Sequence, residues 1–207
     1  GGDPEAERRE RIHRTLELVK GSGVVIKTRL AAAVNEYTFT GQMNVDDTLT
    51  LDFTDGFFAE SIVFNGGEAA DNSDFDTLVI TGGNFGQAIH NFTGPDAGNL
   101  IYSLDGDAMG TLEDQATINY TGLEPVLMNA GSVADLVFNL PGTDDQAILE
   151  DDGIDNDVSQ LRSQNGTPTF ELTTFNNPTG SLTINLGDDD ADCDVSALPD
   201  FDATLII

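Results

Sequence analysis

From residue 24 onward, polar and apolar residues alternate in short runs that are bounded by clusters of Gly, Asn and Asp. A period of two residues is typical of half-buried β-strands, and Gly, Asn and Asp favour the turns between them. No segment after Val34 keeps a helical period for three turns. Residues 24–207 are therefore predicted to be all-β, with strands in the runs Tyr37–Thr40, Thr48–Phe53, Ser61–Phe64, Thr77–Ile80, Ala116–Tyr120, Leu136–Phe138 and Ser181–Ile184.

Some of these strands recur at a fixed spacing. The segment Asp135–Leu140 is similar to Ser181–Leu186, which begins 46 residues later, and Thr204–Ile207 begins a further 23 residues on. An earlier pair of runs begins at Ile62 and Leu78, 16 residues apart. Because 46 is twice 23, and 23 residues make about one coil, the spacing favours a parallel β-helix, a solenoid whose strands stack coil on coil. The alternative is a β-sandwich, which also has short strands but does not explain this register.

The beginning of the chain has a different period. Ile12, Leu16 and Val19 are spaced i, i+4 and i+7, which gives one apolar stripe on an amphipathic α-helix. Asp3 is a suitable N-cap, and Gly21 is a suitable C-cap. The sequence thus predicts an N-terminal helix that either caps one end of the β-helix or is an appended tag.

Two domains follow from these patterns. Residues 1–23 are expected to be the helix and its Gly-Ser-Gly junction, and residues 24–207 the β-helix repeat domain. Thr204–Ile207 stops where a Gly- and Asp-rich turn would be expected. We therefore expect the β-helix domain to be truncated at its C-terminus.

The order of the strand and turn segments also carries a resemblance. The segments that carry it are Asp46–Phe53, Ile62–Gly67, Asp76–Gly83, Ile118–Val126 and Leu182–Asp189. Together they resemble the β-helical repeat modules of giant exported and surface proteins of planctomycete-type bacteria. The resemblance covers roughly Val34 to the C-terminus, and Tyr120–Val126 is its most specific element. It implies a β-helical segment of a secreted or surface protein, without an assigned catalytic residue.

The charge of the chain excludes several classes of partner. The 207 residues include 8 Lys and Arg against 37 Asp and Glu, so the formal net charge is −29. Such a chain is not expected to bind nucleic acid or an anionic membrane surface. Seven of the eight basic residues lie within residues 1–29, and Arg162 is the eighth. The longest apolar stretches have about five residues, as in Leu30–Val34, so no membrane insertion is expected.

The acidic residues are mostly Asp, which favours short turns because its carboxylate reaches nearby backbone N–H groups. Asp-rich turns that stack from coil to coil offer the six to eight oxygen ligands that Ca²⁺ prefers. The alternative is a solvated acidic face. The candidate ligands are Asp144, Asp145, Asp188, Asp189, Asp190, Asp192 and Asp194.

More specific motifs are incomplete. Gly66–Ser73 lacks the third Gly and the apolar residue of the calcium-binding nonapeptide repeat, and Asp155–Gly166 lacks the turn Gly and the final Glu of an EF-hand loop. His13 and His90 have no evident catalytic partner, so His90 is interpreted as structural. Cys193, the single cysteine, lies between two Asp residues that should raise its pKa, so a reactive thiol is not expected.

These patterns lead to a structural interpretation. We expect a non-enzymatic, structural or adhesive segment of a bacterial extracellular or cell-surface protein, rigidified by Ca²⁺ at its Asp-rich turns. Its expected partners are other surface-protein segments, or further copies of the chain that associate through the open C-terminal coil. The alternative function is a β-helix polysaccharide-degrading enzyme or a carbohydrate-binding module.

Overall fold

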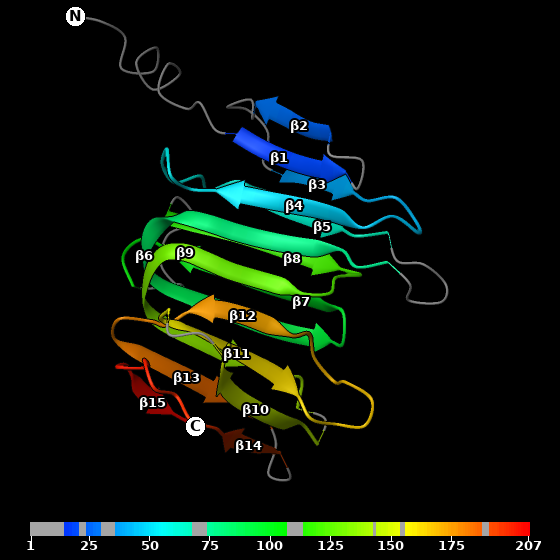
Figure 1. Cartoon of the computed structure of the whole chain (residues 1–207). Coiled ribbons are helices and arrows are strands. Elements are labelled where there is room, and N and C mark those ends of the chain that lie inside the picture. The colour runs from blue at the N-terminus through cyan, green and yellow to red at the C-terminus, as the bar shows by residue number, and fades with distance from the viewer. Residues whose placement is uncertain are drawn as a thin grey trace, which may run out of the picture.

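The computed structural model describes residues 15–20, 24–29, 36–67, 74–106, 114–142, 144–153, 156–187 and 191–207. Within these residues the protein is all-β, as predicted from the alternation (Figure 1). No helix in this part of the chain has the length and apolar character needed to cross a membrane. The strands are β1 (Thr15–Lys20), β2 (Val24–Arg29), β3 (Glu36–Thr40), β4 (Asp47–Asp52), β5 (Ser61–Asn65), β6 (Thr77–Gly94), β7 (Ala97–Ser103), β8 (Gln115–Thr121), β9 (Val126–Asn139), β10 (Gln146–Asp151), β11 (Val158–Ser163), β12 (Thr173–Asn176), β13 (Ser181–Asn185), β14 (Asp192–Val195) and β15 (Thr204–Ile206).

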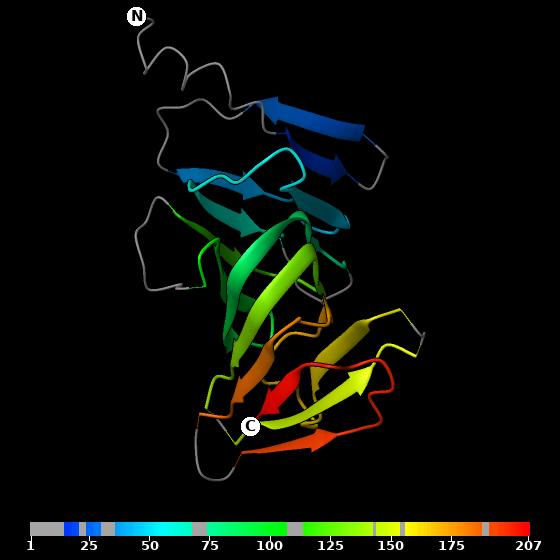
Figure 2. The ribbon, with the colours of Figure 1, turned by 90° about the vertical axis from the view of Figure 1, so that its left-hand side faces the viewer.

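The strands form one mixed sheet that bends over itself into two layers (Figures 1 and 2). The long strands β6 and β9 run parallel to each other and pass from one layer to the other. Their first halves pair with β4 and β12, and their second halves pair with β7 and β13. The edge of the molecule at which β6 and β9 bend is called the bend edge here.

The spacing of 46 and 23 residues is the register of three stacked parallel strands. Ser181 of β13 lies opposite Asp135 of β9 and opposite Thr204 of β15, as the repeat predicts. The earlier 16-residue pair does not stack in this way. Ile62 of β5 pairs with Ile118 of β8, whereas Leu78 of β6 belongs to a different part of the sheet.

Two antiparallel strands interrupt the parallel stacking. β7 lies between β6 and β8, and β11 lies between β10 and β12. Each of them returns the chain within one layer before the next parallel strand begins. The 23-residue spacing is therefore limited to the last coils, and the earlier registers are longer because they include these extra strands.

The N-terminal helix prediction is wrong for residues 15–20, which form strand β1. β1 pairs antiparallel with β4 on one side and with β2 on the other, where Leu18 lies opposite Leu49 and Ile26. Backbone hydrogen bonding to the open edge of β4 outweighs the helical cues, because those cues are local and each stabilises a helix only weakly. The rest of the predicted helix and the Gly-Ser-Gly junction lie outside the described residues.

The core lies between the two layers and is built from the inward-facing residues of each strand. Alternation is strict in β4, where Leu49 and Leu51 are fully buried. Near the bend edge, the rings of Phe53 and Phe58 stack with centroids 4.3 Å apart, and Phe85 packs on Tyr102 at 4.7 Å. Such aromatic pairs contribute about 0.5–1.5 kcal/mol each beyond their buried area.

Candidate functional site

The predicted calcium ligands occupy one stretch of the sheet, but they do not form a closed site. Asp144 and Asp145 directly precede β10, and Asp192 and Asp194 lie on the neighbouring strand β14. Among the described residues, no three His, Cys, Asp or Glu side chains are arranged to hold a metal ion. The predicted ligands Asp188, Asp189 and Asp190 lie outside the described residues, so the calcium prediction remains a prediction.

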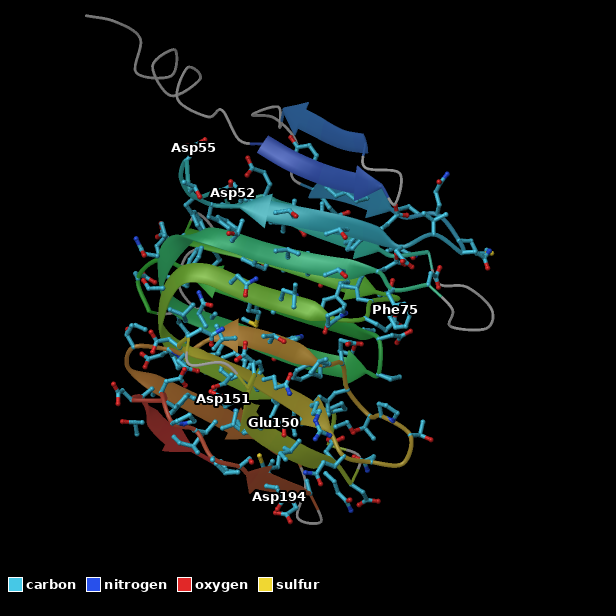
Figure 3. The ribbon with its side chains drawn as sticks, viewed as in Figure 1. Asp52, Asp55, Phe75, Glu150, Asp151 and Asp194 are labelled. Carbon is cyan, nitrogen blue, oxygen red and sulfur yellow. The ribbon has the colours of Figure 1, made fainter. Side chains whose placement is uncertain are left out.

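The described members of this set already have protein partners. Asp145 is fully buried, and its Oδ2 accepts a hydrogen bond from the backbone N–H of Gly142 at 2.8 Å. Its backbone oxygen accepts the N–H of Asp192 at 2.9 Å, which joins the two acidic turns. Asp192 and Asp194 are exposed on β14, and Figure 3 shows Asp194 near the C-terminal end of the molecule. Asp145 thus closes a turn, as an Asp in a turn commonly does.

A second set of carboxylates, which the sequence analysis did not identify, forms a column on the opposite edge from the bends. Asp47, Asp76, Glu124 and Glu171 each stand two residues before a paired residue of β4, β6, β9 or β12. Because these strands are parallel and in register, the four residues follow one another from strand to strand. We call them the acidic column; Figure 3 labels Phe75, the neighbour of Asp76, on this edge.

The acidic column is largely buried and is tied into the backbone. Asp47, Asp76 and Glu171 have 0%, 1% and 4% exposed surface. The N–H of Gln42 donates to Asp47 Oδ2 at 2.5 Å, and the N–H of Asp47 donates to Asp76 Oδ1 at 2.7 Å. The N–H of Glu124 donates to the backbone oxygen of Asp76 at 2.7 Å. These bonds fasten the turns of successive strands to one another.

Burial of these carboxylates changes their protonation. Burial, assisted by the charges of Asp74, Asp47 and Asp46, raises the pKa of Asp76 to about 6. Burial, followed by the charge of Glu124, raises the pKa of Glu171 to about 8. Glu171 therefore holds a proton at neutral pH. One signal was present in the sequence, because Asp47 and Asp76 both begin the tripeptide Asp-Thr-Leu.

His90 and Cys193 are both shielded from solution chemistry. His90 is fully buried in β6, where its Nε2 lies 2.6 Å from the hydroxyl oxygen of Tyr120 and its Nδ1 lies 3.3 Å from that of Thr173. Burial lowers the pKa of His90 to about 3, so the ring is neutral over the physiological range. Burial, with a contribution from Asp192 and Asp194, raises the pKa of Cys193 to about 11. The raised cysteine pKa was predicted from the sequence, although burial is its larger cause.

A ladder of asparagine side chains runs across the outer surface of one layer. Each amide donates to the next, from Asn185 to Asn139, from Asn139 to Asn91, from Asn91 to Asn99 and from Asn99 to Asn119. The donor–acceptor distances are 2.7, 2.6, 3.1 and 3.0 Å in this order. The ladder crosses β13, β9, β6, β7 and β8, and it therefore ties parallel and antiparallel strands into one surface.

The bend edge, which faces the viewer in Figure 2, carries two hollows that meet at Gly131. The first has a volume of about 480 Å³ and is lined by the aromatic rings of Phe53, Phe57 and Phe85 and by Leu104. The second has a volume of about 520 Å³ and is polar. We call the two hollows together the edge groove, with an aromatic end and an acidic end.

The acidic end of the edge groove is held together by Asp200. Its Oδ2 accepts the backbone N–H groups of Asp157 at 2.7 Å and Asn156 at 3.1 Å, and Asn177 Nδ2 lies 3.3 Å from its Oδ1. Burial by itself would raise the pKa of Asp200, but these hydrogen bonds outweigh it and lower the pKa. Asp200 is therefore ionised at neutral pH, and Asp157 and Asp202 line the same hollow.

Comparison of the chain with protein-family models, with curated proteins and with solved structures finds no match.

Proposed function

We propose that this chain is a rigid structural segment of a bacterial extracellular or cell-surface protein. The observation that carries the proposal is the parallel register in which β9, β13 and β15 stack at 46 and 23 residues. We interpret this stacking as a β-solenoid with antiparallel insertions. A solenoid is extended and stable against local distortion, because each coil is held by both of its neighbours. These properties suit a spacer or adhesive stalk.

The surface features support a structural role. The asparagine ladder and the acidic column both run across successive strands, so they stabilise stacking and leave no isolated reactive group. The groups most suited to catalysis, His90 and Cys193, are a buried neutral imidazole and a thiol of high pKa. We therefore propose a segment that is not an enzyme.

The C-terminal coil supports association with further segments. Among the described strands, β14 pairs only with β10, and β15 pairs only with β13. Val195, Ile206 and Ile207 on this coil are 46%, 50% and 53% exposed. Edge strands with exposed apolar side chains readily accept another strand, so we propose that a further surface-protein segment or a second copy stacks here.

A pair of deletions tests the solenoid. Removal of residues 181–203 takes out one whole coil and places Thr204 where Ser181 pairs with Asp135. Removal of residues 181–192 takes out about half a coil and breaks the register. We expect the first variant to keep a β-sheet circular dichroism spectrum and a cooperative melt, and the second to lose both. Equal tolerance, or equal loss, would contradict the stacking interpretation.

The functional class is tested by activity. The purified chain is incubated with a panel of neutral and acidic polysaccharides, and reducing ends and unsaturated products are measured over time. We expect no saturable turnover. Saturable hydrolysis or elimination that a point variant abolishes would replace the structural proposal with the enzymatic one.

A further inference from the structure

The edge groove has two chemically distinct ends. Its aromatic end lies beside the C-terminal end of β4, where Phe53 follows Asp52. Figure 3 labels Asp52 and Asp55 at this position. Its acidic end contains the carboxylates of Asp157, Asp200 and Asp202, and no Lys, Arg or His lines either hollow among the described residues. A complementary occupant is therefore an extended segment with an apolar residue followed by several cationic ones.

The N-terminal segment of this chain starts next to the aromatic end. β1 pairs antiparallel with β4 so that Leu16 lies opposite Leu51, which places Thr15 beside Asp52. Residues 1–14 therefore join the sheet at the bend edge, directly beside the residue that precedes Phe53. Their point of attachment is set by the backbone pairing of β1.

The segment is long enough to span the groove. Asp52, Thr81, Asn129 and Asn176 follow one another across β4, β6, β9 and β12. Three strand spacings amount to about 14 Å. Fourteen residues reach about 46 Å when extended and about 21 Å as a helix. Either conformation reaches the acidic end.

The chemistry of the segment matches the groove in order and in sign. Ile12, three residues before Thr15, comes first at the aromatic end. Next along the groove come Arg11, Arg9 and Arg8, which belong to the stretch of the chain that holds seven of its eight basic residues. Arginine forms charge-assisted hydrogen bonds with carboxylates and tolerates partial burial, because its charge is delocalised.

We propose that residues 1–14 occupy the edge groove of the same chain, with Ile12 against the aromatic end and Arg8, Arg9 and Arg11 against Asp157, Asp200 and Asp202. This contact goes beyond the structural role proposed above. It covers an aromatic surface and neutralises carboxylates that lie close together. The N-terminal segment then acts as a strap along the bend edge, which differs from a cap over the end of the stack.

Disulfide trapping in the full chain tests the strap. In a Cys193→Ser background, Ala6→Cys is combined with Thr179→Cys at the acidic end of the groove. The control combines Ala6→Cys with Met43→Cys, which is 66% exposed and lies near the acidic column. Nine residues from Thr15 reach about 30 Å, enough for either partner. We expect the groove pair to form its intramolecular disulfide at least about tenfold faster, because docking raises the effective concentration.

Charge variants make the test specific. Asp157→Asn combined with Asp202→Asn should remove most of this rate difference, as should 1 M NaCl, where the Debye length is about 3 Å. Asp192→Asn combined with Asp194→Asn changes the net charge equally but lies outside the groove, and it should leave the rate difference unchanged. Asn suits position 157, because Asp157 has φ 59° and Asn tolerates that backbone conformation.

Three outcomes would overturn the proposal. The first is equal rates for the groove pair and the control pair. The second is an equal loss of rate in the two double-Asn variants, which would indicate a general charge effect. The third is a disulfide-linked dimer in place of the intramolecular product, which would assign the groove to a second copy. Melting curves of each variant by circular dichroism verify that the fold is kept.

Discussion

Replacement of the buried Glu171 by Gln should stabilise the protein at neutral pH. Glu171 is 4% exposed, and burial raises its pKa to about 8 from 4.5. Because the folded pKa is the higher one, the stability contributed by its proton is complete below pH 4.5 and is lost as the pH rises through 8. Gln has nearly the same shape as the protonated acid and does not titrate.

The magnitude follows from proton linkage. Between pH 4.5 and pH 7, the unfolded chain releases the proton of Glu171 while the folded chain keeps most of it. The free energy of unfolding falls by about 1.36 kcal/mol per pH unit over this range, which amounts to about 3 kcal/mol at pH 7. The Glu171→Gln variant does not lose this stability. It should therefore match the parent chain at pH 4 and exceed its free energy of unfolding by about 3 kcal/mol at pH 7.

Urea unfolding followed by circular dichroism at pH 4, 5.5 and 7 measures the difference directly. Other groups titrate equally in both proteins, so they cancel in the comparison. Glu150→Gln is the matched control of opposite sign, because its bond to Arg162, with Nε and Oε1 2.7 Å apart, lowers the pKa of Glu150. That variant should be slightly less stable than the parent at pH 7. A Glu171→Gln variant whose stability advantage does not grow between pH 4 and pH 7 would refute the argument.

Three shorter predictions concern the turns, the core and the cation. Gly66→Ala should destabilise the fold by more than about 3 kcal/mol in urea unfolding, because its Cβ would lie 1.9 Å from a backbone oxygen, whereas Gly166→Ala meets no atom within 4 Å and should be nearly neutral. Tyr120→Phe removes the partner of His90 Nε2 and should cost about 1–3 kcal/mol, while Tyr102→Phe removes a buried hydroxyl that has no partner in the described part of the chain and should cost little. If the Asp-rich turns bind calcium, millimolar Ca²⁺ should raise the melting midpoint above its value in EDTA, and an equal rise in Mg²⁺ or in NaCl of matched ionic strength would leave only charge screening.

The strands and their last registers were predictable because both depend on short-range patterns. Alternation identifies a half-buried strand without knowledge of its neighbours, and Asp135, Ser181 and Thr204 begin similar strands at equal or doubled spacing. The antiparallel insertions were not predictable in this way. β7 and β11 alternate like any other strand, and their direction depends on how the preceding turn closes.

The N-terminal segment shows the opposite failure. Each helical cue in residues 3–21 is local, whereas the strand state of Thr15–Lys20 depends on the edge of β4, which lies about 30 residues further along the chain. The acidic column was missed for a related reason. Asp47, Asp76, Glu124 and Glu171 are separated by 29, 48 and 47 residues, so no single period relates them. Their common position becomes visible only when the strands are paired.

The excess of Asp over Glu was predicted to indicate short turns, and several turns confirm it. Asp52 Oδ1 accepts the N–H of Thr54 at 2.8 Å, and Asp151 Oδ1 accepts the N–H of Gly153 at 2.7 Å, both two residues further on. The Glu side chain is one methylene longer, so it is less suited to this short-range bond. Much of the acidic composition is therefore used inside the backbone of the turns.

The formal charge of −29 consequently overstates the repulsion within the fold. Adjacent strands are about 4.8 Å apart, and two carboxylates at that distance repel by about 3–4 kcal/mol at an effective dielectric constant of 20. A fully ionised acidic column would place such a pair at every step. The raised pKa of Glu171 leaves it protonated at pH 7, which relieves its repulsion with Glu124, and backbone N–H groups offset the charge of Asp47 and Asp76. The turns are thus stabilised by carboxylates that would destabilise them if none were protonated or hydrogen-bonded.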